Sequence, residues 1–299
     1  MKSYQWQVTS GKRTLKACGT RSCHLSPVTF NPTGFTLVEM LVVIAIAGII
    51  AALAVPAIKN LGKSNISLSA SRQLLDDIGH ARQLALSQRT TVYLVFVPTN
   101  FWAGGGPIPN NWWNTLSPGA QTAATNLADK QLTGYTFIAR GALGDQPGKH
   151  QWHYLAPWQN LPDGTFIAQQ KFISPANSFG IIAFDSKVPI YGFATNAFPF
   201  PTETNVPIAT PWPSLPYIAF NYLGQLTVDG QSLAERDEYI PLSKGTVSPA
   251  VNVTTKALVL SGTPQVLESP PGNTTNSSYN IIHIDHLTGR AVLEFQKIQ

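Results

Sequence analysis

The sequence predicts an α+β fold, in which one long N-terminal α-helix packs on a C-terminal antiparallel β-sheet domain. Residues 35–58 form an apolar run whose only ionisable side chain is Glu39. Residues 59–89 repeat apolar side chains at spacings of seven, three and four, typical of one face of a helix. From residue 90 onward, β-branched and aromatic runs alternate with Gly- and Pro-rich turns. Helix followed by strands, without alternation, favours the α+β class.

The apolar run 35–58 is long enough to span a membrane. At about 1.5 Å per residue, a helix of this length crosses a hydrocarbon core of roughly 30 Å. A carboxylate such as Glu39 costs about 2.5–3.5 kcal/mol there on insertion scales. A position in the first helical turn, where the helix dipole favours negative charge, would make Glu39 tolerable but would give it no role.

The residues around Glu39 supply a role. The string Gly34-Phe35-Thr36-Leu37-Val38-Glu39 resembles the class III signal of type IV prepilins and pseudopilins. The resemblance implies that prepilin peptidase cleaves between Gly34 and Phe35, that the new Phe35 amine is N-methylated, and that helix 35–58 packs against other pilin subunits. It also implies that Glu39 pairs with the Phe35 amine of an adjacent subunit. The implied location is the bacterial inner membrane, with one pass and a periplasmic C-terminal domain, and then a periplasmic or cell-surface filament.

The charge distribution fits a removable leader at residues 1–34. This segment carries five of the 20 basic side chains and none of the 15 acidic ones, so the rest of the chain is formally neutral. Basic residues before an apolar run favour a cytoplasmic N-terminus. The sequence pI of about 9.2 is therefore no argument for nucleic-acid binding. Both cysteines, Cys18 and Cys23, also lie in the leader, at a spacing that is poor for a metal site.

An ordinary secretory signal is the competing interpretation. Residues 40–51 could form its apolar region, and Ala52-Leu53-Ala54 resembles a signal-peptidase site before Val55. The product would be a signal-anchored or secreted β-rich binding module for a glycan or a protein. Glu39 at the start of the apolar region and the distant basic residues argue against this interpretation.

Residues 59–89 are predicted to be an amphipathic helix, and residues 90–299 a β-rich domain. The apolar stripe of the helix comprises Leu61, Leu68, Leu74, Leu75, Ile78, Ala81, Leu84 and Ala85, and its charged residues are expected to face solvent. Candidate strands are 91–97, 135–139, 152–155, 165–173, 180–184, 217–222, 257–260, 280–285 and 291–295. Residues 223–225 and 287–289 are expected to form hairpin turns. Gly, Pro, Ser and Asn mark loop insertions at 99–131, 196–216 and 269–279.

Within the pilin class the order of segments is similar to FimT/FimU minor pilins and to type II secretion pseudopilin H. The segments that carry this similarity are helix 69–86 with Ala81-Arg82, strand 91–97, residues 158–164, residues 218–224 and the closing Asp285…Thr288-Gly289-Arg290. Some FimT-like pilins take up DNA through a basic Gly-Arg-x-Arg tail. Here Val292 stands in place of the second arginine, so nucleic-acid binding is a minor alternative.

Three tryptophans in the first insertion are the candidate recognition residues. Trp102, Trp112 and Trp113 lie among Gly, Pro and Asn residues, where exposed rings could bind a glycan or a partner. The alternative is that the rings fold back onto the sheet as part of a core.

Catalysis is not predicted. The sequence has no nucleophile elbow, phosphate loop, zinc-protease helix or Cys-x-x-Cys pair, so neither an enzyme nor a cofactor is expected. The most metal-like cluster is His283-Ile284-Asp285-His286. On a strand, His283 and Asp285 would share one face and His286 would point to the other, which is poor for chelation, so no metal is predicted.

Overall fold

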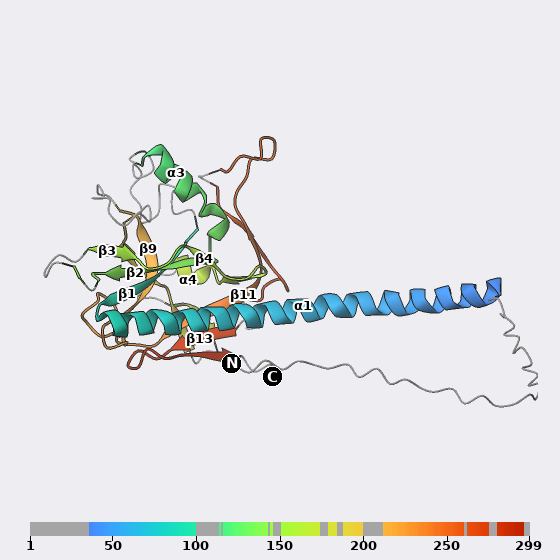
Figure 1. Cartoon of the computed structure of the whole chain (residues 1–299), viewed down its shortest axis with the longest axis horizontal. Helices are drawn as coiled ribbons and strands as arrows, with labels where there is room; N and C mark the ends of the chain where they lie inside the picture. Colours follow the sequence, from blue (N-terminus) through green and yellow to red (C-terminus); the bar gives the residue numbers. More distant parts are fainter. Residues whose placement is uncertain are drawn as a thin grey trace, which may run out of the picture. The chain divides into compact units, whose positions relative to one another are not determined.

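The computed structural model describes residues 36–99, 114, 116–142, 144–145, 151–173, 179–183, 188–199, 212–259, 262–274 and 280–295. Helix α1 (Leu37–Gln88) precedes antiparallel β-sheets, which confirms the predicted α+β, pilin-like arrangement (Figure 1). The chain divides into two compact units, Met1–Ala54 and Val55–Gln299, and each is described by itself.

The first unit contains the N-terminal turns of α1. Thr36 caps the helix, because its Oγ1 accepts a hydrogen bond from the Glu39 amide at 3.2 Å. Among the residues that the structure describes, no helix is long and apolar enough to cross a membrane. The span predicted for 35–58 is therefore not confirmed. Phe35 and the side chains of residues 53–58 lie outside the described part, and the span stays a prediction.

In the second unit α1 buries one face, as its apolar spacing predicts. Fully buried side chains recur every three or four residues: Ala70, Leu74, Ile78, Ala81 and Ala85. The predicted Leu68, Leu75 and Leu84 are half-buried at the edges of this stripe. The side chain of the predicted Leu61 lies outside the described part.

The first sheet is built on the strand that follows α1. Its hydrogen-bonded order is β10 (Leu226–Thr227), β9 (Ser214–Phe220), β1 (Thr91–Phe96), β2 (Gly134–Arg140) and β3 (Trp152–Tyr154). Two further strands pair with members of this order, namely β4 (Gln159–Asn160) with β2 and β8 (Ala194–Ala197) with β9. All of these pairs are antiparallel.

The second sheet is formed largely by the C-terminal part of the chain. Its order is β12 (Gln265–Glu268), β11 (Glu238–Ser248), β13 (Asn280–Ile284) and β14 (Ala291–Phe295), and β5 (Thr165–Ile167) also pairs with β11. Strands β6 (Phe179–Ala183) and β7 (Val188–Tyr191) form a separate antiparallel pair. The two larger sheets share no strand pairing within the described residues.

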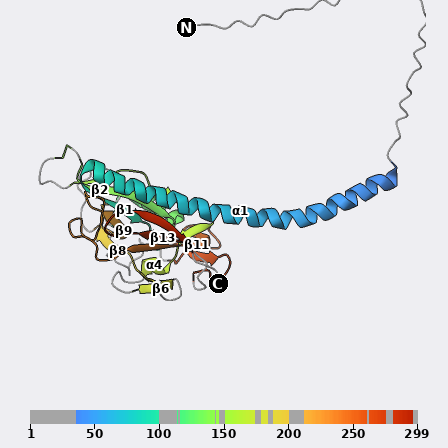
Figure 2. The ribbon, with the colours of Figure 1, turned by 90° about the horizontal axis from the view of Figure 1, so that it is seen from below.

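The α1 stripe belongs to a core that includes both larger sheets. That core contains Val92, Leu94 and Phe96 of β1, Ile218 and Phe220 of β9, Ile240 and Leu242 of β11, and Ile282 and Ile284 of β13. Figure 2 shows the C-terminal part of α1 running alongside these strands. Tyr93 and Val95 of β1, and Val97 just after it, enter a second core beside α3 (Pro118–Thr125). Strand β1 is thus buried on both faces, which accounts for its continuous apolar sequence.

Two polar residues of α1 also contact the sheet domain. Asp77 accepts a hydrogen bond from the Tyr135 hydroxyl, and Arg82 Nε donates to the carbonyl oxygens of Thr288 at 2.7 Å and Gly224 at 3.2 Å. The prediction that all charged residues of this helix face solvent is therefore wrong for these two.

The hairpin turns predicted at 223–225 and 287–289 are confirmed, and they touch each other. Gly224 has φ +75 and Gly289 has φ +63, a backbone conformation that favours glycine. A Cβ atom at Gly289 would lie 1.9 Å from the Gly224 carbonyl oxygen. The Leu226 amide also donates to the His286 carbonyl at 3.0 Å. A hairpin turn of one sheet therefore contacts a hairpin turn of the other, and Arg82 donates hydrogen bonds to both turns.

Four sequence predictions are corrected. The strand predicted at 165–173 ends at Ile167 and is followed by helix α4 (Gln170–Ile173), whose Lys171 is buried against the Tyr191 carbonyl and Glu238. The loop predicted at 99–131 contains α3, which Ser117 caps ahead of a proline in the first turn, and a 3-10 turn, Ala128–Lys130. The loop predicted at 196–216 begins in β8 and ends in β9. For the strand predicted at 257–260 only a single bridge, Val251 to Leu258, is found in the described part.

The longest strand, β11, was not predicted. Pro241 and Gly245 interrupt its β-type sequence, and both residues usually mark turns. Position 245 requires a glycine, because a Cβ there would lie 2.0 Å from the Leu267 carbonyl oxygen of β12. Pro241 has no amide hydrogen to donate, but its carbonyl oxygen accepts a hydrogen bond from the Ala168 amide at 3.0 Å.

Removing the Arg82 guanidinium should loosen the contact between the sheets. Arg82→Met keeps most of the apolar stem but leaves the Thr288 and Gly224 carbonyls without this charged donor, so we expect the free energy of unfolding to fall by about 2 kcal/mol. Denaturant unfolding of a fragment beginning at Ser64 measures this loss. Arg72→Met, at an exposed position of the same helix, is the matched control and should change little. Equal stability of the two variants would contradict the proposed contribution of Arg82.

Candidate functional site

The first candidate site is the start of α1 around Glu39. The Thr36 cap fixes Glu39 in the first turn, and the Met40 amide donates to the Thr36 carbonyl at 3.2 Å. A carboxylate in this turn interacts favourably with the helix dipole. The predicted cleavage residues Gly34 and Phe35 lie outside the described residues, so their roles stay predictions.

Apolar side chains surround Glu39 on all sides of the helix. The large ones are 47–82% exposed: Leu37, Val38, Met40, Leu41, Val42, Val43, Ile44, Ile46, Ile49 and Ile50. No other part of the described chain covers them. A contiguous apolar surface of this kind marks a site that binds a membrane or other proteins. A partner that covers it must also satisfy the single carboxylate.

The predicted recognition residues Trp102, Trp112 and Trp113 lie outside the described residues. The structure therefore distinguishes neither a recognition loop nor a core position for them, and their role stays a prediction.

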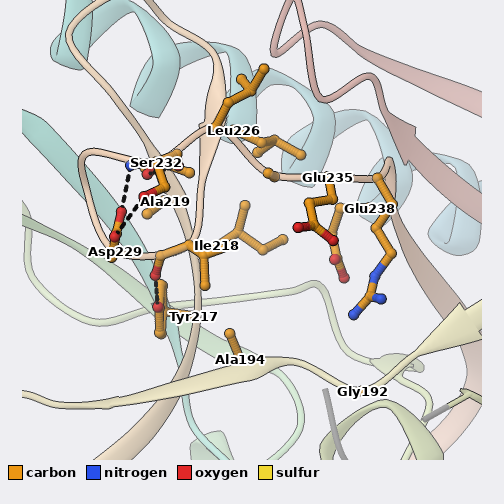
Figure 3. A pocket seen from close by; sticks show the side chains of 15 residues that line it. Gly192, Ala194, Tyr217, Ile218, Ala219, Leu226, Asp229, Ser232, Glu235 and Glu238 are labelled. Atoms are coloured by element: carbon orange, nitrogen blue, oxygen red, sulfur yellow. Dashed lines mark hydrogen bonds between the residues drawn. The ribbon is translucent and has the colours of Figure 1, made fainter. Parts of the chain in front are cut away.

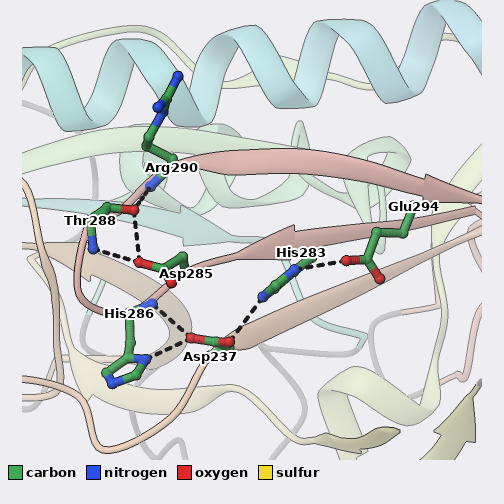
Figure 4. Close-up of polar contacts among 7 residues, drawn as sticks. All are labelled: Asp237, His283, Asp285, His286, Thr288, Arg290 and Glu294. Atoms are coloured by element: carbon green, nitrogen blue, oxygen red, sulfur yellow. Dashed lines mark hydrogen bonds and ion pairs between the residues drawn. The ribbon is translucent and has the colours of Figure 1, made fainter.

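A polar cluster on the second sheet is the nearest approach to a chemical site (Figure 4). Asp237 Oδ2 lies 3.0 Å from His283 Nε2, and Asp237 Oδ1 lies 2.6 Å from His286 Nδ1. The other ring nitrogen of His283, Nδ1, lies 2.8 Å from Glu294 Oε1. The His283 ring also stacks on Tyr239, with centroids 4.6 Å apart. Both nitrogens of His283 thus face carboxylates, an arrangement that suits a ring that donates from both.

This cluster differs from the predicted one. His286 does not point away from His283, because the turn after β13 brings both rings to Asp237. Asp285 instead accepts from the Thr288 amide and hydroxyl, both at 2.7 Å, and stabilises the hairpin turn. Asp237 lies 46 residues before His283, and no sequence signal connects them. Within the described part of the chain no group of three or more His, Cys, Asp or Glu residues has an arrangement that could hold a metal ion.

Electrostatics in the cluster stabilise the Asp237 carboxylate. Partial burial acts to raise the pKa of Asp237, but hydrogen bonds from the His286 ring and amide and from the His283 ring outweigh it and lower that pKa to about 2. The cluster therefore acts as a charged crosslink between β11 and β13. It offers no nucleophile with an activating base.

A cavity of about 460 Å³ lies beside β9 and the segment that leads into β11 (Figure 3). Its floor is apolar and includes Ala194, Ile218 and Leu226. Two of the carboxylates at this cavity are already engaged. Asp229 accepts from the Ser232 amide and hydroxyl, and Glu238 pairs with Lys171. Burial lowers the pKa of Lys171, while Glu238 opposes that shift. No local sequence pattern indicates this cavity, because its walls come from three separate segments.

Comparison with known proteins identifies one segment of the chain. The family model described as the prokaryotic N-terminal methylation motif matches residues 31–55. No curated protein and no solved structure matches the chain. The motif supports a type IV pilin-like protein and includes the predicted cleavage site and Glu39.

Acid should weaken the Asp237 crosslink. Because the pKa of Asp237 is lower in the folded protein than its ordinary value near 3.8, its stabilising effect is present above about pH 4 and is lost as pH falls towards 2. Asp237→Asn should therefore cost about 1 kcal/mol at pH 5, a value reduced by partial solvent exposure, and less at pH 2. Chemical unfolding of both proteins across this range measures the difference. A stability difference that does not change with pH would show that Asp237 does not stabilise the fold through its charge.

Proposed function

We propose that this protein is a structural subunit of a type IV pilin-like filament, and not an enzyme. The observation that carries the proposal is the methylation motif at residues 31–55. The motif coincides with the capped, apolar start of α1, whose exposed face contains Glu39. A binding surface that is apolar all around and contains one carboxylate suits packing among identical or related helices.

Processing is the first step of the proposed function. Prepilin peptidase cleaves between Gly34 and Phe35, and the Phe35 amine is methylated. Cleavage removes the basic leader 1–34 and creates a positive charge four residues before Glu39. Before assembly, the apolar segment 35–58 lies in the inner membrane and the β-rich domain lies in the periplasm.

Assembly then uses both charges. In a filament, the Glu39 carboxylate of one subunit pairs with the Phe35 amine of its neighbour. An ion pair buried among apolar helices stabilises little by itself, but an unpaired charge there is costly. The pair therefore fixes the register between subunits, because helices shifted along one another would leave both charges unmatched.

We place the subunit among minor pilins or pseudopilins, in a type IV pilus or a type II secretion filament. The support is the order of segments shared with FimT/FimU and pseudopilin H, together with the contact of Arg82 with Gly224 and Thr288. These residues belong to segments that carry the resemblance, and in this chain they join the helix to both sheets.

A secreted or signal-anchored binding module is the second candidate. One observation favours it: Ala52-Leu53-Ala54 resembles a signal-peptidase site directly before Val55. Cleavage there would discard Glu39 and most of the methylation motif. N-terminal sequencing of the mature protein separates the two candidates, since the first requires N-methyl-Phe35 and the second Val55.

Substitution of Gly34 should block processing. A side chain at this position fills the space that the peptidase needs before the scissile bond, so Gly34→Ala should slow cleavage and Gly34→Leu should leave the precursor in the inner membrane. Immunoblotting resolves the precursor from the product by the mass of residues 1–34. Gly48→Ala is the matched control, because a Cβ there meets nothing within 4 Å. Normal processing of Gly34→Leu would rule out the class III signal.

Substitution of Glu39 should block assembly alone. Glu39→Val removes the insertion cost but leaves the partner Phe35 amine unpaired, so the protein should be inserted, cleaved and methylated yet be depleted at least about tenfold from sheared filaments. Met40→Leu, an apolar exchange at the next position, should assemble normally. The pairing role is wrong if the valine variant enters filaments at the wild-type level.

A further inference from the structure

A second cavity, of about 450 Å³, opens where α1 ends. Its lining comes from the helix end, β1, β2 and two loops, and includes Arg89, Thr91, Tyr93, Arg140 and Tyr222. The volume lies within the range of about 300–1,000 Å³ that is usual for small-ligand sites. Unlike the cavity in Figure 3, it contains two arginines.

Arg140 is held in place by neutral aromatic groups. Its positive charge lies near the Tyr93 hydroxyl and acts to lower the pKa of that phenol, and its guanidinium carbon lies 5.8 Å from the ring centroid of Trp152. Burial raises the pKa of Tyr93, so the phenol stays neutral at pH 7. Arg140 forms no ion pair with any residue that the structure describes. Its charge is therefore oriented but not neutralised.

Arg89 is the second cation. It follows the last residue of α1 and has φ 51, the left-handed conformation common just after a helix end. Its side chain is exposed and makes no hydrogen bond or ion pair in the described part of the chain. The helix end thus presents a free guanidinium at the mouth of the cavity.

The one carboxylate of the cavity, Asp229, is occupied by its own loop. It accepts hydrogen bonds from the Gln231 amide at 2.8 Å, the Ser232 amide at 2.6 Å and the Ser232 hydroxyl at 2.9 Å. The contact with Ser232 is visible in Figure 3. These bonds, with the Ser232 amide first, lower the pKa of Asp229 to about 2. Asp229 is therefore ionised at neutral pH, but its two oxygens are turned to its own loop and form no ion pair with Arg89 or Arg140 in the described structure.

Tyr222 adds a flat apolar face to this positive site. Its side chain is 57% exposed, although it belongs to the wall of the cavity. A tyrosine offers a large, rigid contact surface at low conformational cost. Guanidinium groups, for their part, match carboxylate and phosphate oxygens through paired hydrogen bonds.

We propose that this cavity binds a sugar ring that carries a carboxylate or a phosphate. The acid group contacts Arg89 and Arg140, and the ring lies against Tyr222. A nucleic-acid backbone is a poorer match, because it needs a series of cationic contacts and the chain after residue 34 is formally neutral. The site is independent of residues 34–58, so its failure would leave the filament proposal intact.

The test is ligand binding to the full-length chain in a non-ionic detergent and phosphate-free buffer. Calorimetry with glucuronate and with glucose 6-phosphate should detect binding, whereas glucose should bind at least about tenfold more weakly. Inorganic phosphate carries the acid group without the sugar ring, so it should bind more weakly than glucose 6-phosphate if the ring is also recognised. Whichever of glucuronate and glucose 6-phosphate binds more tightly shows whether the cavity prefers a carboxylate or a phosphate.

Variants assign binding to the cavity. Arg89→Gln and Arg140→Gln should each weaken binding of the preferred acid at least about tenfold, the effect of losing one charge-assisted hydrogen bond. Arg72→Gln, at an exposed position of α1, should not change it. If Arg140→Gln fails to fold, Arg89→Gln decides, since its side chain has no contact to lose in the described structure. The proposal is overturned if both acids fail to bind, if glucose binds equally well, if Arg89→Gln binds normally, or if only a DNA oligonucleotide binds.

Discussion

Two sheets that share no strand pairing within the described residues meet on one face of α1. The fully buried Ala70, Leu74, Ile78, Ala81 and Ala85 belong to the same core as the inner strands of both sheets. Small residues at three of these positions let the backbones approach closely. Without this stripe each sheet would expose an apolar face, so the helix is the element that makes one domain out of two sheets. Arg82 completes the joint where the two hairpin turns touch.

The two parts of α1 satisfy different physical requirements. The part in the second unit is one-sided, because its own sheets cover one face and water covers the other. The part in the first unit is apolar all around, and the described chain covers none of it. A helix of the second kind is stable only in a membrane or among other helices. The change in periodicity along α1 therefore separates the surface that folds the domain from an apolar surface that the described chain leaves exposed.

The sequence was sufficient to predict the structure where a residue type has one common structural role. Apolar periodicity located the buried stripe, and the glycines at 224 and 289 located the hairpin turns. It was insufficient where tertiary contacts reverse a local preference. Proline and glycine usually mark turns, yet Pro241 and Gly245 lie in the longest strand, where β13 pairs with residues 238–242, β5 with 242–244 and β12 with 245–248. Lysine is usually exposed, yet Lys171 is buried with Glu238.

The polar sites were still harder to predict from the sequence, because they depend on tertiary contacts. Asp237 meets His283 and His286 only because β11 and β13 are neighbours, a pairing that the sequence analysis lacked once β11 was missed. Arg89 and Arg140, which line the cavity near the end of α1, lie 51 residues apart in the sequence, and neither lies in a recognisable motif. Sites of this kind depend on strand order, which local patterns do not encode.

The distance along the chain between Arg82 and its partners has a consequence for biosynthesis. Arg82 reaches carbonyls 142 and 206 residues later, and the core strand β13 begins only at Asn280. During synthesis, the apolar stripe of α1 emerges long before the strands that cover it. The domain therefore completes its core only when nearly the whole chain has been delivered, and contacts so remote in sequence form slowly. Until then, the exposed stripe is a binding surface for chaperones and a starting point for aggregation.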